Sequence, residues 1–179
     1  TYGYLYDNTA MYFDKYCKFN GAEYYATLKD LHDMEGTTSY HVGVGREYES
    51  FIKCIKDLSD NTSKKTIYVD GGEYDIFNEI GGKAFCDTIA NGETDWKKYS
   101  VIIPPNTTII GLGNVVFNFT PTIEEIGNGL KLLSPINIQG TCHLENITVN
   151  ASNCRYCIHD ETSGDTKFTG AKKTYKNVH

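Results

Sequence analysis

Residues 41–76 constrain the fold most, because they predict a helix followed at once by a strand. Apolar side chains recur at helical spacing at Tyr48, Phe51, Ile52, Ile55 and Leu58, so the predicted helix carries one apolar stripe. After the polar run 59–65, the β-branched and aromatic segment 66–69 predicts a strand that ends at the glycine-containing turn 70–72. The stripe must be buried, and we expect the helix to lie across the open end of a sheet.

The second half of the chain alternates short apolar segments with Gly, Asn and Pro. It predicts strands at residues 101–103, 107–110, 115–119, 136–138, 144–149, 156–158 and 175–178. Most connections differ from the two-residue Asn-Gly turns of antiparallel hairpins. In the segment 144–149, Ile147 and Val149 are expected to point inward and residues 146, 148 and 150 outward.

Two phrases in these segments resemble pectate-lyase-like proteins. One is Val42-Gly43-Val44-Gly45 followed by Tyr48, the predicted helix and Asp70-Gly71-Gly72-Glu73-Tyr74; the other is the segment 103–113. The resemblance covers residues 41–179 and implies a mainly β fold, a single-stranded right-handed parallel β-helix of which this chain holds the first few coils. It also implies that the helix caps the first coil. Ile147 lies 37 residues after Ile110 and 31 before Val178, so loops must project from the coils.

Residues 1–40 differ in character and are rich in tyrosine. We expect helices at about residues 9–19 and 22–35, with apolar faces that pack on each other, on the following domain or on another subunit. This predicts a small helical N-terminal extension, a linker or adaptor, joined near residues 36–39 to a domain at 41–179. The chain begins at Thr1 and ends in a strand-like segment, so we expect it to continue beyond residue 179.

Charge and composition argue against several classes of partner. The net charge is −6, and lysine and arginine do not cluster with the aromatic residues, which disfavours nucleic acid. No apolar run approaches the roughly 20 residues that span a bilayer, so membrane insertion is not expected.

Six cysteines are present, including the pair Cys154 and Cys157 at CxxC spacing. A redox pair and half of a zinc site are both compatible with that spacing, but no second ligand pair follows at suitable distance. We therefore expect buried, reduced, structural cysteines.

The densest polar cluster in the sequence is the segment 153–161. Its candidate glycan-binding residues are Arg155, Tyr156, His159, Asp160 and Glu161. Strand alternation would place residues 156, 158 and 160 on one face and residues 155, 157 and 159 on the other. The plainer alternative is structural, with Arg155 paired to Asp160 or Glu161 and His159 capping a turn. No cofactor is expected, although calcium at Asp70, Glu73 and Asp75 is an alternative to a solvated acidic turn.

The phrase around Arg155 also resembles β-helix domains of phage and prophage tail proteins. That resemblance implies a tail spike or receptor-binding protein at the virion tail, outside the cell, and commonly trimeric. We expect it to present its β-helix to a bacterial surface polysaccharide and to join other tail or baseplate subunits through residues 1–40. The alternatives are a polysaccharide lyase or glycoside hydrolase on the same fold, whose site would lie beyond this chain, and a structural virion protein that binds no glycan.

Overall fold

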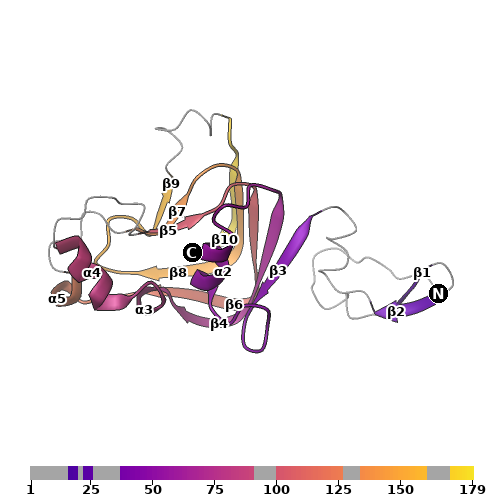
Figure 1. Cartoon of the computed structure of the whole chain (residues 1–179), viewed down its shortest axis with the longest axis horizontal. Coiled ribbons are helices and arrows are strands. Elements are labelled where there is room, and N and C mark those ends of the chain that lie inside the picture. The colour runs from indigo at the N-terminus through magenta and orange to yellow at the C-terminus, as the bar shows by residue number, and fades with distance from the viewer. Residues whose placement is uncertain (1–15, 20–21, 26–36, 91–99, 127–133, 161–169) are drawn as a thin grey trace.

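The structure is a computed structural model that describes residues 16–19, 22–25, 37–90, 100–126, 134–160 and 170–179. Strands dominate these residues, and every pairing in the two larger sheets is parallel (Figure 1). The predicted mainly β fold is therefore confirmed.

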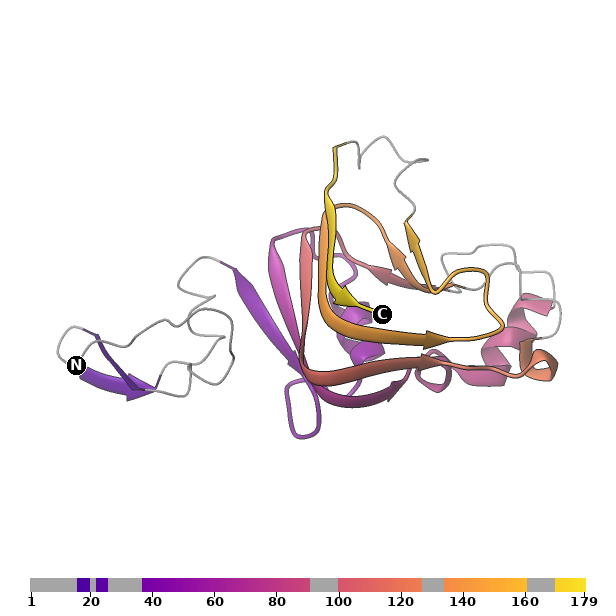
Figure 2. The same ribbon diagram turned by 180° about the vertical axis from the view of Figure 1, so that it is seen from behind.

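The larger sheet has five strands in the spatial order β10-β8-β6-β4-β3. In chain order they are β3 (Thr38–Val42), β4 (Lys65–Asp75), β6 (Thr107–Phe119), β8 (Cys142–Ala151) and β10 (Lys173–Val178). The smaller sheet, in the order β5-β7-β9, consists of β5 (Ser100–Ile103), β7 (Ser134–Ile138) and β9 (Ile158–Asp160). From β4 onward, the chain alternates between the two sheets. Figure 2 shows the long strands bending together.

The helices lie around this pair of sheets. They are α2 (Phe51–Asp57), α3 (Ile76–Glu79), α4 (Gly82–Ala90) and α5 (Ile123–Ile126). The predicted helix at 51–58 is confirmed by α2. Ser50 caps α2 by accepting a hydrogen bond from the Lys53 amide at 3.1 Å, and Glu79 of α3 accepts one from the Ile52 amide at 3.2 Å. None of the helices described is long and apolar enough to cross a membrane.

The core fills the space between the bent sheet and the smaller sheet. Its long-sheet side includes Ile67, Ile109 and Leu144, register partners on successive strands that are almost fully buried. The apolar stripe of α2 joins this core through Phe51, whose ring stacks on that of Phe117 with centroids 4.4 Å apart. The helix therefore packs against the interior of the sheets (Figure 1).

Two predicted strand ends were wrong, because the strands continue through their glycines. β4 passes Asp70-Gly71-Gly72 and runs to Asp75, while β6 joins the segments predicted at 107–110 and 115–119. The register shifts between Asp70 and Gly72, and again between Ile110 and Val115. Glycine permits a bulge in which the strand bends without losing its partner.

The N-terminal helices expected at 9–19 and 22–35 were wrong for the residues described there. Tyr16–Phe19 forms β1 and Ala22–Tyr25 forms β2, an antiparallel pair in which Phe19 faces Ala22. The connecting sequence is Asn20-Gly21, which is the strongest short-range signal for a hairpin. The rest of both expected helices lies outside the described residues. β3 spans the expected boundary between residues 40 and 41.

One charged side chain is enclosed in the core. Lys65 is 0% exposed, and its ammonium donates to the Pro105 carbonyl at 2.9 Å. Burial lowers the pKa of Lys65, because removing the charged form from water is unfavourable.

The burial of Lys65 predicts a pH-dependent stability. The unfolded chain binds this proton more tightly than the folded protein, so stability should rise with pH from the lowered pKa towards the ordinary lysine value of about 10.4. The free energy of unfolding of the wild type minus that of Lys65→Met should therefore increase between about pH 7 and pH 10. Urea denaturation measures the free energy of unfolding of both proteins at each pH. The control is Lys64→Met, which replaces the exposed neighbouring lysine. A pH-independent difference would contradict the expectation.

Candidate functional site

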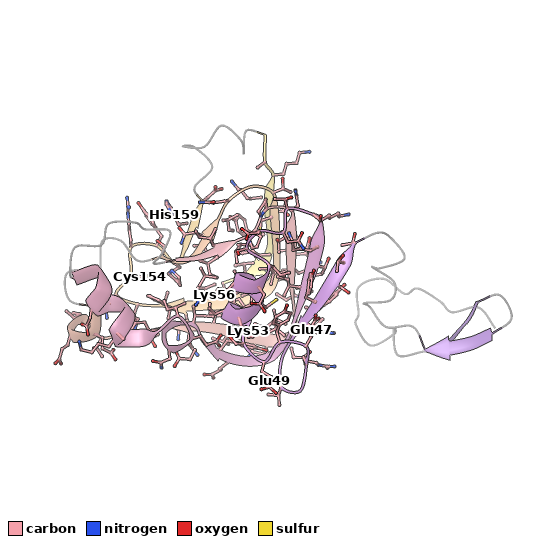
Figure 3. The ribbon with its side chains drawn as sticks, viewed as in Figure 1. Glu47, Glu49, Lys53, Lys56, Cys154 and His159 are labelled. Atoms are coloured by element: carbon pink, nitrogen blue, oxygen red, sulfur yellow. The ribbon has the colours of Figure 1, made fainter. Side chains whose placement is uncertain are left out.

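The segment after β8 carries the residues predicted as a glycan-binding site. Asn153 adopts a left-handed backbone (φ 49°), and its side-chain amide donates to the Pro121 carbonyl at 2.9 Å. The chain then turns through residues 154–157 into β9. Figure 3 shows Cys154 and His159 on the β9 side of the molecule, away from Glu49 in the loop after β3.

Residues 158–160 alternate in β9 as predicted, but Tyr156 lies outside the strand. Ile158 and Asp160 pair in register with Ile136 and Ile138, whose buried side chains face the core. His159 pairs with Asn137 and points the other way. Tyr156 precedes the strand and stacks on His159, so it does not share a face with residues 158 and 160.

Three of the predicted residues form one exposed stack. The rings of Tyr156 and His159 lie nearly parallel, with centroids 5.0 Å apart and an interplanar angle of 15°. On Tyr156 lies the Arg155 guanidinium, 5.0 Å from the ring centroid, in a cation–π arrangement. The tyrosine side of this stack is open to solvent, since Tyr156 is 44% exposed. We call Arg155, Tyr156 and His159 the aromatic stack.

A buried asparagine orients the histidine of the stack. Asn137 is 1% exposed, and its Nδ2 donates to the Ser134 carbonyl at 3.0 Å. Its Oδ1 therefore faces the Nδ1 atom of His159, 2.9 Å away, so that Nδ1 carries the hydrogen. Asn137 could not be recognised from the sequence, because it is 22 positions from His159 and only the sheet register brings the two residues together.

Asp160 belongs to a different environment from the stack. It forms an ion pair with Lys173 of β10 at 2.5 Å, and the Lys173 side chain is only 8% exposed. The structural alternative, an ion pair between Arg155 and Asp160, is therefore not the observed pairing: Arg155 lies over Tyr156. Glu161 lies outside the described residues.

The cysteines described from α2 onward are free thiols that differ in exposure. Cys54, Cys86 and Cys142 are buried free thiols, as expected, whereas Cys154 is partly buried and Cys157 exposed. Burial raises the pKa of Cys54 and Cys142 to about 12 and that of Cys154 to about 11. Protonated thiols are weak nucleophiles and weak metal ligands.

The acids considered for calcium each have a separate partner. Asp70 accepts from the Arg46 guanidinium at 2.6 Å, Glu73 accepts from Asn118 at 3.1 Å, and Asp75 caps α3. Among the residues described, no cluster of three or more His, Cys, Asp or Glu side chains is arranged to hold a metal ion.

Comparison with known proteins does not assign a family to this chain. Searches against protein-family models, curated proteins and solved structures find no match.

Proposed function

We propose that the chain is part of a pectate-lyase-like right-handed parallel β-helix that serves as a phage or phage-like tail spike or receptor-binding protein. Support for the β-helix comes from strands that follow one another in sequence order within a parallel sheet and alternate with a second parallel sheet. Each pass through both sheets would then be one coil, with α2 capping the first. The resemblance of the sequence phrases supports the tail-protein assignment.

The single observation that carries glycan binding is the aromatic stack. A flat, solvent-open ring can pack against the apolar C–H face of a sugar, while the neighbouring guanidinium donates hydrogen bonds to hydroxyl or carboxylate oxygens. Because His159 is held by the buried Asn137, the platform is preorganised, and less conformational entropy is lost on binding. The ligand we propose is a bacterial surface polysaccharide. Attachment through residues 1–40 and a trimeric state rest on the resemblance alone.

The glycan-binding proposal predicts a loss of affinity on removing the tyrosine ring. Tyr156→Ala should weaken binding about tenfold, which corresponds to about 1.4 kcal/mol, because it removes the stacking face. Tyr156→Phe keeps that face and is the matched control. A glycan array identifies the ligand, and calorimetry on this chain measures the affinities of the variants.

The same assay separates the alternative functions. Binding without shortening of the polysaccharide supports a receptor-binding protein, whereas release of oligosaccharides moves the assignment to a lyase or hydrolase. Equal affinities for the wild type and Tyr156→Ala would reject the aromatic stack as the site. No binding to any bacterial polysaccharide would favour a structural role.

A further inference from the structure

A second polar cluster lies on the outer face of the long sheet, between β8 and β10. Thr174 and His143 are register partners, and the Thr174 hydroxyl lies 2.6 Å from His143 Nδ1. The other ring nitrogen, Nε2, lies 3.1 Å from Glu145 Oε2. Lys176 donates to the second carboxylate oxygen of Glu145 at 2.7 Å. These residues alternate with the core residue Leu144, so they point away from the interior.

With His143 in its neutral form, the hydrogen bonds of this cluster have a defined direction. The hydrogen bond from Lys176 is the main cause that lowers the pKa of Glu145, with a smaller contribution from His143. Glu145 is therefore a carboxylate and only accepts. A neutral His143 must then carry its hydrogen on Nε2, which leaves the lone pair of Nδ1 as the acceptor for the Thr174 O–H group. The hydroxyl thus donates to a base that a carboxylate orients.

We propose that Thr174, His143 and Glu145 form a nucleophile–base–acid triad that transfers the acyl group of an ester to water. The three roles follow from the hydrogen bonds, since a hydroxyl nucleophile needs an adjacent base and the base needs an orienting group. Thr174 is the candidate catalytic nucleophile and His143 the candidate catalytic base. Glu145 is a positioning residue that acts through His143.

The reaction balances with water as the only co-reactant. Thr174 Oγ1 attacks the ester carbonyl while His143 Nδ1 takes the hydroxyl proton, and the leaving alcohol departs with that proton. Water then attacks the acyl-threonine, His143 again accepts the proton, and Thr174 recovers it as the carboxylic acid is released. No metal or redox cofactor takes part in these steps.

The position of the triad limits its substrate. Thr174 is exposed on a sheet face, so a long acyl chain bound there would remain in water. Because the site is open, exclusion of water contributes little to the rate. The geometry therefore favours a short acyl group carried on a large molecule that lies along the sheet. That the carrier is a polysaccharide rests on the proposed function, whereas the triad itself does not.

The test uses p-nitrophenyl acetate, an activated acetyl ester that contains no sugar. We expect release of p-nitrophenol and an acetyl group on the peptide that contains Thr174, located by mass spectrometry because exposed thiols and imidazoles also react. Thr174→Ala and His143→Gln should lower the rate at least tenfold, and Thr174→Ser should restore it. Glu145→Gln should lower kcat more than it changes KM, since it removes the orienting carboxylate.

The matched control is Thr108→Ala. Thr108 is the register partner of His143 on β6, on the side opposite to Thr174, and its loss should leave the rate unchanged. Equal rates for the wild type and Thr174→Ala, or no acetyl group on Thr174, would overturn the triad. Because the probe lacks a sugar, that outcome is distinguishable from failure of the glycan-binding proposal, and circular dichroism confirms that each variant is folded.

Discussion

Replacing Phe117 with alanine is expected to destabilise the protein by about 3–5 kcal/mol, a large share of the roughly 5–15 kcal/mol typical of a domain. Phe117 is 1% exposed, stacks on Phe51 of α2 and contacts the Tyr74 ring edge to face at 5.8 Å. Its loss removes apolar contact area and leaves a cavity beneath α2. Urea denaturation should show the lower midpoint.

Hydrogen exchange shows where the Phe117→Ala variant loses structure. The backbone amides of α2 should exchange faster, because the helix loses its stacking partner. Phe119→Ala is the matched control: Phe119 is also 1% exposed on β6, but its ring contacts Phe77 of α3 at 5.5 Å. That variant should be destabilised without a selective effect on α2. Equal protection of α2 in the wild type and Phe117→Ala would contradict this role.

The second large effect is expected for Gly111→Ala. A Cβ atom at this position would lie 2.1 Å from the Asn146 carbonyl oxygen and 3.0 Å from Val115 Cγ2. Backbone cannot move aside as a flexible side-chain end does, so β6 and β8 must separate at the bulge. We expect a loss of about 3 kcal/mol or more, or failure to fold.

A glycine with open space around its Cβ position provides the control for Gly111→Ala. Gly45 has φ +71°, and no heavy atom lies within 4 Å of its Cβ position. Gly45→Ala should therefore cost only about 1–2 kcal/mol, the penalty of left-handed backbone. Thermal denaturation compares the two variants, and equal midpoints would show that the close approach of β6 and β8 is not rigid.

Hydrophobic periodicity in the sequence identified the helices and strands that bury one face and expose the other. The stripe of α2 was predictable because one face meets the core, and Ile147 and Val149 are buried as alternation requires. The strand register was not predicted: Ile147 pairs with Val178, 31 residues later in the sequence, and with Val115, not Ile110, on the other side. The bulge at residues 111–114 adds residues that spacing alone cannot reveal.

The candidate sites were predictable only in part, for a related reason. Arg155, Tyr156 and His159 stand close in the sequence, so a local cluster could be recognised. The residues that contact this segment could not be recognised, because they lie on strands from other parts of the chain. Asn137 forms a hydrogen bond with His159, and Lys173 forms an ion pair with Asp160. The same holds for Thr174 and His143, which are 31 residues apart. The pairing of β1 with β2 was missed, although the intervening sequence Asn20-Gly21 is a hairpin signal.

The parallel order of the long sheet also determines how the chain can fold. Lys65 pairs with Thr107, Thr107 with Cys142, and Cys142 with Lys173, so each new pairing must first close a loop of 42, 35 or 31 residues. The entropy of closure is lost before the contacts form, which makes folding slow. Once α2, β3 and β4 are in place, each later strand can use the preceding one as a template. Assembly would then proceed as elongation from a nucleus, with kinetics that depend on how early α2 docks.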